Sequence, residues 1–324
     1  MFQFKKTVSV LFVLTGLMLF SSVSIAQSSK KIRTIIVDAG HGGKDDGARS
    51  EYEGSLNSKE KNITLAISLK VVAQLQKDLP DVTIIPTRTT DVYQNPREKA
   101  QIANDNHGDL FVCIHADAVR LKTASRIIGH RKETYYTTKY VGKGSKRKKI
   151  RTPHTHVVPV REYYKLPTSR KGTSTLIIAS HKTNAKTEAL AESDMQFNTE
   201  SNDSTLNINY DSPEWKASAL LYTQRYFKRS YQLATDVQDE IAAIGRNNLG
   251  VWQREIGIWV LQATQMPAVL IETGFIDNYD DERYLNSEKG QQEIAESISR
   301  ALIKYKNQVE SSPANANAAA INSK

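Results

Sequence analysis

Short blocks of consecutive apolar residues recur along the chain, separated by longer stretches in which polar residues dominate. Blocks of this length, rich in Ile and Val, are typical of buried strands. The predicted strands span residues 34–38, 82–87, 110–114, 175–179, 257–261 and 268–272.

The intervals between these strands show the spacing of helices. Over residues 60–79 apolar side chains recur every three or four positions, which predicts a helix that Asn57 or Ser58 can cap and Pro80 ends. Further helices are predicted over residues 96–104, 184–196, 212–245 and 287–305. Strands that alternate with helices indicate the α/β class, with a twisted, mainly parallel or mixed sheet flanked by helices.

Two segments interrupt this alternation, and composition shows that one of them is unusual. Residues 119–171 have no sustained apolar period and hold 16 Lys and Arg against 2 Asp and Glu, a net charge of +14. Since the whole chain carries +9, the remainder sums to −5. We interpret 119–171 as a basic insertion, either a solvated loop or a hairpin built around its tyrosine pairs. Residues 181–211 are polar and form a second interruption.

The two ends of the chain differ from its body. Lys5 and Lys6 precede the apolar run 7–20 and the small-residue site 24–26, so residues 1–26 are predicted to be a cleaved export signal. An uncleaved anchor is the alternative, but the run is short of the roughly 20 residues that a span requires. We therefore expect a periplasmic or secreted protein without a transmembrane anchor. The tail, residues 311–324, is rich in Ala, Asn and Ser and is predicted to be disordered.

Chemistry-bearing residues follow three of the predicted strands. His41, His115 and Glu272 come at their carboxyl ends, which meet at one edge of a parallel sheet. Glu60, at the start of the first helix, could join them. Cys113 is the only cysteine, which excludes a disulfide framework and a zinc site built from several cysteines.

Two histidines and a carboxylate are the ligands of many catalytic zinc sites, and a second carboxylate can move the proton. Each residue also has a structural alternative: a hydrogen-bonded loop histidine, a glutamate at a helix N-terminus, or a strand-end ion pair.

Several motifs resemble one family, the zinc-dependent N-acetylmuramoyl-L-alanine amidases called amidase 3. They are TIIVDAGHGGKDDGA (34–48), KEKN (59–62), TRTTD (87–91), residues 97–104, IHAD (114–117) and PAVLIETGF (267–275). The resemblance covers residues 32–118 and 172–306, so residues 32–306 are expected to form the catalytic domain, with a phosphorylase/hydrolase-like fold. Asp46 stands where the family usually has Pro, and Cys113 where it often has Ser.

The resemblance also implies roles for individual residues. It places Zn²⁺ on His41, Glu60 and His115, and it makes Glu272 the catalytic residue that takes a proton from water and delivers it to the departing nitrogen. The bond cut by the family joins the lactyl group of N-acetylmuramic acid to the L-alanine of the peptidoglycan stem peptide. Such activity serves cell-wall remodelling or daughter-cell separation.

The resemblance leaves regulation and partners open. In some members a helix covers the zinc, and the place of that helix corresponds to residues 184–196, where Glu188 and Glu192 could occlude the site or lie on a solvated face. An envelope activator protein is a further expected partner. Residues 119–171 could bind an anionic envelope polymer, or hold a second metal through His154 and His156, whereas nucleic acid is not expected for an exported protein.

Two rival functions remain at this point. One is another exported zinc amidohydrolase or peptidase on the same scaffold. The other is a non-catalytic envelope-binding protein whose working part is the basic insertion, although the presence of both Glu60 and Glu272 argues against it.

Overall fold

The structure, a computed structural model, describes residues 31–179, 212–254 and 258–311. The predicted export signal, the segment that contains Glu188 and Glu192, and the tail from residue 312 lie outside these residues. The chain divides into a larger unit, residues 33–302, and a smaller one formed by residues 1–32 and 303–324. All strands of both sheets belong to the larger unit. No helix in the described part of the chain is long and apolar enough to span a membrane.

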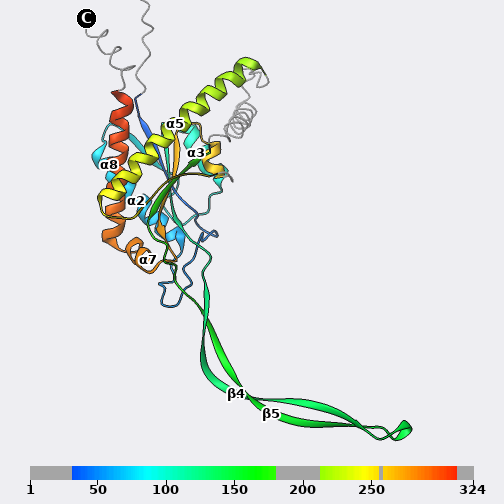
Figure 1. Ribbon diagram of the computed structural model, residues 1–324. Helices are drawn as coiled ribbons and strands as arrows, with labels where there is room; N and C mark the ends of the chain where they lie inside the picture. Colours follow the sequence, from blue (N-terminus) through cyan, green and yellow to red (C-terminus); the bar gives the residue numbers. More distant parts are fainter. Residues whose placement is uncertain (1–30, 180–211, 255–257, 312–324) are drawn as a thin grey trace, which may run out of the picture. The chain divides into compact units, whose positions relative to one another are not determined.

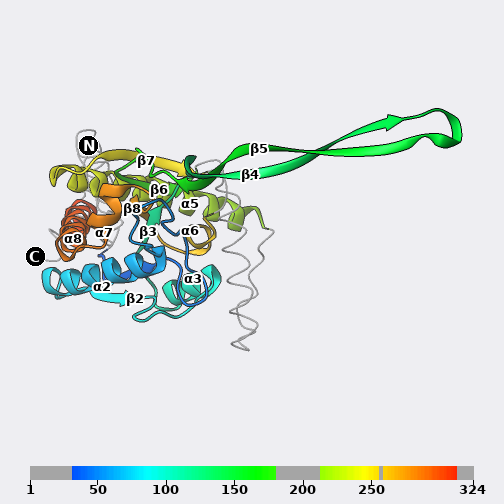
Figure 2. The ribbon, with the colours of Figure 1, turned by 90° about the horizontal axis from the view of Figure 1, so that it is seen from below.

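The core of the larger unit is a six-stranded sheet with the order β2-β1-β3-β8-β6-β7 (Figures 1 and 2). Its strands are β1 (Thr34–Ala39), β2 (Thr83–Pro86), β3 (Leu110–Asp117), β6 (Thr173–Ile178), β7 (Asn248–Arg254) and β8 (Ala268–Phe275). β2, β1, β3 and β8 are mutually parallel, β6 runs antiparallel to β8, and β7 is parallel to β6. The predicted α/β class with a mainly parallel sheet is confirmed.

Helices cover both faces of this sheet. On one face, α2 (Glu60–Asp78) packs against β1 to β3 and α5 (Pro213–Ala243) against β6 to β8, with the first part of α8 (Glu288–Glu310) bonded to both. Gln292 of α8 donates to Gln74 of α2 at 3.3 Å, and Arg300 pairs with Glu240 of α5 at 2.8 Å.

The opposite face carries α3 (Pro96–Asp105) and α6 (Trp259–Ala263), which pack on buried Phe111, Cys113 and Leu270. Because strand side chains alternate between faces, His115 and Glu272 also point toward α3 and α6. This face therefore determines the surroundings of the candidate site.

The predictions for the region after residue 245 were partly wrong. Residues 259–263 form helix α6 instead of the predicted strand 257–261, since Leu261 and Gln262 both donate to the carbonyl of Ile258. A short apolar run does not distinguish a buried strand from a buried helical turn. The sheet is completed by β7, which was not predicted because it is a partly exposed edge strand without a clear apolar alternation.

The predicted cap of α2 was also wrong. Lys59 is the N-cap residue, and its side chain makes no capping hydrogen bond. Ser58 instead donates to Glu282, at 2.7 Å, in α7 (Tyr279–Leu285), a short helix that was not predicted. Ser50, Tyr52 and the amide of Leu56 donate to the same carboxylate. Glu282 thus holds the loop that connects β1 to α2.

Glu282 is fully buried, so its replacement should be costly. We expect Glu282→Ala to lower the free energy of unfolding by about 3 kcal/mol at pH 7, because several donors lose their acceptor. Burial raises the pKa of Glu282, but the hydroxyl donors outweigh it and the net pKa is lowered from its usual 4.5. The stabilisation should therefore be complete above the unfolded-state pKa and decrease as pH falls toward the folded-state pKa. Urea unfolding at pH 7 and pH 3 measures both effects; an equal loss at the two pH values would contradict them.

The basic insertion forms a long antiparallel hairpin of β4 (Thr123–Val141) and β5 (Lys148–Lys165), visible in Figure 1 as two paired ribbons. No residue of either strand is buried, and all of them are described. The hairpin alternative is thus the correct one, with strands much longer than its tyrosine pairs suggested. His154 and His156 pack around the ring of Tyr135, at centroid distances of 5.2 and 5.3 Å.

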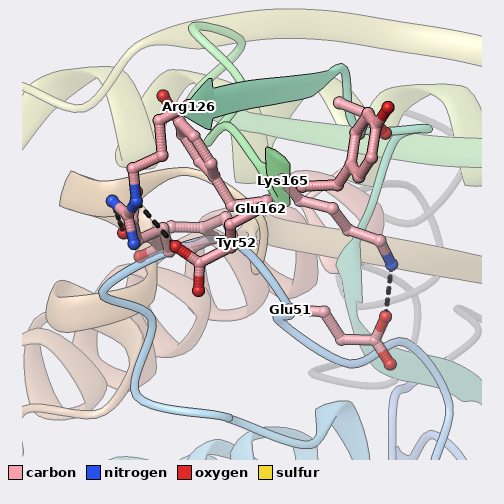
Figure 3. Close-up of a pocket in the computed structure, with 9 residues that line it drawn as sticks. Glu51, Tyr52, Arg126, Glu162 and Lys165 are labelled. Atoms are coloured by element: carbon pink, nitrogen blue, oxygen red, sulfur yellow. Dashed lines mark hydrogen bonds and ion pairs between the residues drawn. The ribbon is translucent and has the colours of Figure 1, made fainter. Parts of the chain in front are cut away.

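The base of the hairpin is joined to the loop that Glu282 holds. Arg126 pairs with Glu53 at 2.6 Å and with Glu162 at 2.7 Å, Lys165 pairs with Glu51, and the amide of Glu53 donates to the carbonyl of Lys165 (Figure 3). These contacts surround a polar pocket of about 520 Å³. Because the charged side chains around this pocket pair with one another, we infer that they anchor the hairpin to the loop between β1 and α2.

Candidate active site

The structure brings His41, Glu60, His115 and Glu272 to the same edge of the sheet. His41 follows β1, His115 lies near the end of β3, and Glu272 is opposite His115 in the neighbouring strand β8. Glu60 is the first residue of α2. Among the described residues, only His41, Glu60 and His115 form a group of three or more potential metal ligands, with ligand atoms within 4.8 Å of one another.

Glu60 links the two histidines. Its Oε2 lies 3.0 Å from Nε2 of His41, and its Oε1 lies 2.8 Å from Nδ1 of His115. The same carboxylate accepts hydrogen bonds from the amides of Ala48 and Ala116. Backbone donors on both sides therefore fix its orientation between the imidazoles.

The loop that carries His41 fits tightly around this group. His41 itself has a left-handed backbone (φ 58°), which is uncommon for a residue other than glycine. Gly47 has φ +64°, and a Cβ there would lie 2.6 Å from Oε2 of Glu60. A Cβ at Gly40 would lie 2.5 Å from Nε2 of His115. The absence of a side chain at Gly40 and Gly47 thus allows His41, Glu60 and His115 to approach one another.

Two residues that sequence reasoning did not single out support the ligands. Asp45 accepts from Nδ1 of His41 at 2.8 Å, which leaves Nε2 free to act as a ligand. Buried Arg88 donates to the carbonyls of Ala39, Gly40 and Lys61, and so joins the His41 loop to α2. Both lie inside the family-like motifs, and a hydrogen-bonding carboxylate four residues after a ligand histidine was a usable signal.

The electrostatics of the group favour a bound cation. Burial lowers the pKa of His41, but hydrogen bonds and charge from Glu60 and Asp45 raise it to about 9. Burial would raise the pKa of Glu60, yet the hydrogen bonds from His115 and His41 hold it far below its usual range. The carboxylates that retain a proton on His41 would equally favour a divalent ion in its place, so proton and metal should compete.

The donor set fits zinc. Imidazole nitrogens and one carboxylate are ligands that Zn²⁺ accepts, and tetrahedral bonds of about 2.0–2.2 Å place ligand atoms roughly 3.5 Å apart. The closest donor atoms here are already 2.8 to 3.0 Å apart, so small side-chain rotations suffice. Asp45 supplies the outer carboxylate that usually orients a metal-bound histidine.

Glu272 differs from Glu60 in its surroundings. It is buried, and among the described residues none forms a hydrogen bond with its Oε2. Burial raises the pKa of this carboxyl to about 7, with His115 acting in the opposite direction and the charges of Asp117 and Glu60 adding to the rise. A carboxyl with a pKa near neutrality can both accept and donate a proton, as a general base and acid must.

These groups line a cavity of about 480 Å³. His41, Glu60, His115 and Glu272 form its polar side, whereas Pro96, Ile258 and Trp259 form an apolar side. Trp259 is 37% exposed and lies under the guanidinium of Arg97, 5.3 Å from the ring centroid. The arrangement suits a substrate with one polar reacting group and an adjacent ring or hydrocarbon surface.

Comparison with known proteins gives consistent results. AmiC, an N-acetylmuramoyl-L-alanine amidase of Escherichia coli O6:H1, is 25% identical over 84% of this chain; the chain spans about half (52%) of AmiC. An amidase structure from Clostridium difficile 630 is similar with a TM-score of 0.52 and 22% identity, over 85% of this chain and 97% of that one. The CwlD amidase from Clostridioides difficile, solved in complex with the GerS lipoprotein, is similar with a TM-score of 0.50 and 21% identity. The match covers 84% of this chain and 98% of that one. The similarity to these two solved structures supports the α/β fold described above.

The family comparison covers most of the chain. The model of the family Amidase_3, described as N-acetylmuramoyl-L-alanine amidase, matches residues 35–304. This range contains all four residues of the candidate site and the whole central sheet except Thr34, the first residue of β1. The protein therefore belongs to the Amidase_3 family of N-acetylmuramoyl-L-alanine amidases.

Proposed function

We propose that this protein hydrolyses the amide between the lactyl group of N-acetylmuramic acid and the L-alanine of the peptidoglycan stem peptide. His41, Glu60 and His115 would hold Zn²⁺, and Glu272 would transfer the proton. The observation that carries the proposal is the convergence of three ligand side chains beside Glu272. We also propose that the protein acts in the periplasm or outside the cell, in wall remodelling or daughter-cell separation.

The residues of the site account for the chemistry that such a reaction requires. Bound zinc would supply a Lewis acid that polarises a carbonyl and makes water more acidic. Glu272 faces the same cavity, its Oε2 has no hydrogen-bond partner among the residues that the structure describes, and it can accept the proton of the attacking water. The raised pKa allows this carboxyl to hold that proton near neutral pH, so that it can deliver it to the departing nitrogen. The apolar wall at Trp259 offers a surface for a sugar ring.

Product analysis tests this proposal. Purified peptidoglycan digested with the protein should release stem peptides that begin with L-alanine, identified by mass spectrometry. Peptides cut at an internal bond would identify a zinc peptidase instead. Binding without any cleavage, with zinc present, would favour the non-catalytic envelope-binding protein.

We propose that residues 181–211, which lie outside the described residues, regulate the site. Glu188 and Glu192 are four positions apart, so a helix would place both on one face. Deletion of residues 181–205 is expected to raise the basal rate of peptidoglycan cleavage if this segment occludes the site. An unchanged rate would contradict the proposal. One similar amidase has been solved with a lipoprotein, which supports an envelope protein as the activator that would relieve such occlusion.

We further propose that the hairpin binds an anionic polymer of the envelope. On one face, the guanidinium of Arg151 lies 4.3 Å from the ring centroid of Tyr136, and that of Arg147 lies 4.6 Å from the ring centroid of Tyr140. Both rings are about half exposed, at 52% and 53%. Pairs of an aromatic ring and a guanidinium can stack on sugars and pair with carboxylates or phosphates.

The hairpin can be removed without disturbing its anchored base. Ile127 and Arg161 are opposite each other, so residues 128–160 can be replaced by a two-residue Asn-Gly turn. We expect this variant to lose most salt-sensitive binding to peptidoglycan sacculi, measured by co-sedimentation at increasing salt, while it still cleaves soluble muropeptides. Sedimentation equal to that of the intact protein would show that the hairpin does not bind the wall.

A further inference from the structure

A second cavity lies directly beside the candidate active site. It has a volume of about 200 Å³ and shares Asp117, Arg254 and Glu272 with the first cavity. Its other lining residues are Arg170, Ser174, Leu176, Trp252 and Gln253. The two cavities therefore meet at these three residues. Trp259 lines only the first cavity, whereas Arg170 and the exposed Trp252 line only the second.

Both arginines are attached to well-fixed backbone. Arg254 is the last residue of β7, opposite Ile178 of β6. Arg170 lies in the connection that precedes β6, where the amide of Gly172 donates to buried Asp281 and the side chain of Asn278 donates to the carbonyl of Thr168. Its guanidinium lies over the ring of Phe275, 5.0 Å from the centroid. Two cationic groups are thus held at one small cavity.

The second cavity holds two guanidinium groups, those of Arg170 and Arg254, beside the carboxyls of Asp117 and Glu272. Within the described part of the chain, neither guanidinium forms an ion pair with a carboxylate, and that of Arg170 contacts only the ring of Phe275. Their donors can therefore be used by a ligand, and guanidinium groups prefer carboxylates or phosphates.

We propose that Arg170 and Arg254 form a subsite for a free carboxylate of the stem peptide. The inference rests on the proposed amidase function and deepens it. Such a subsite would orient the substrate across Glu272. The sugar would lie against Trp259, and the acidic peptide, which is the leaving group, would lie against the two arginines. The subsite thus selects stems that carry a negative charge close to the cleaved bond.

A matched pair of substrates tests the subsite. Two synthetic N-acetylmuramoyl peptides are needed, identical except that the carboxylate nearest to L-alanine is free in one and amidated in the other. The intact protein should prefer the free acid by about 10-fold in kcat/KM, as for a charge-assisted hydrogen bond. Arg170→Gln and Arg254→Gln should each reduce this preference, and the double variant should abolish it, with a larger loss on the free acid than on the amidated substrate. Arg33→Gln, at the opposite end of β1, is the control and should change nothing.

Each outcome has a definite meaning. An equal loss on both substrates would show that the arginines only balance Asp117 and Glu272, and would overturn the subsite. A preference that persists in the double variant would overturn it as well. Inhibition by the free stem peptide gives a second measurement, since its inhibition constant should rise about 10-fold in the double variant. If the intact protein released no peptide beginning with L-alanine from either substrate, the proposed function itself would fail.

Discussion

Glu272→Gln should keep the proposed zinc and lose about 10³-fold in kcat on soluble muropeptides, the usual scale for removal of a general base. Glutamine has nearly the shape of glutamate, so the buried position opposite His115 should be preserved. It cannot accept the proton of water, and it has no titrating group near pH 7 to return a proton to the leaving nitrogen. Single-turnover rates and the zinc-to-protein ratio by mass spectrometry are the two measurements.

The control for this variant is Glu288→Gln, which removes an exposed carboxylate at the start of α8. It should retain the original rate. A Glu272→Gln protein that keeps more than about a tenth of its activity would transfer the proton role to another residue, with Asp117 as the next candidate in the cavity. Loss of zinc together with activity would instead make Glu272 a ligand.

Glu60→Gln should have the second large effect, because it removes the only negative charge among the three proposed ligands. We expect zinc affinity to fall more than about 100-fold, beyond the range typical of an outer-shell substitution, and activity to fall with it. Competition with a chromogenic chelator measures the affinity, and excess zinc should partly restore the rate.

Asp45→Asn provides a graded comparison. Asp45 contacts only the far nitrogen of His41 within the ligand group, so its loss should reduce zinc affinity by about 10- to 100-fold. The expected order of affinities is therefore the intact protein, Asp45→Asn, then Glu60→Gln. If Glu60→Gln bound zinc as tightly as the intact protein, the proposed ligand set would be incorrect.

The candidate site was more predictable from the sequence than many of the helices, strands and loops around it. β1, β3 and β8 are continuous buried runs, and a buried parallel strand leaves such a run in the sequence. Their carboxyl ends meet at one edge, so the sequence alone predicts that His41, His115 and Glu272 lie together. Arg88 and Arg170 could not be placed in this way, because polar side chains in loops carry no periodic signal, and Arg254 could not because the edge strand β7 shows no clear apolar alternation.

The errors also have physical causes. Residues 259–263 are a single buried turn, too short for helical periodicity to appear. β4 and β5 expose both faces, so no alternation of apolar and polar residues marked their extent or register. Ser58 stands where a helix cap is expected, but its hydroxyl donates to Glu282, a residue far away in the sequence.

The position of β8 in the sheet has a consequence for the order in which this protein can become active. β8 lies between β3 and β6, but it follows both of them in the chain. A chain that ends before residue 268 would leave the facing edges of β3 and β6 unpaired and would lack Glu272. Loop closure over such a long separation is slow compared with local pairing. The proposed activity should therefore appear in one late step, and truncated or incompletely folded chains should lack it.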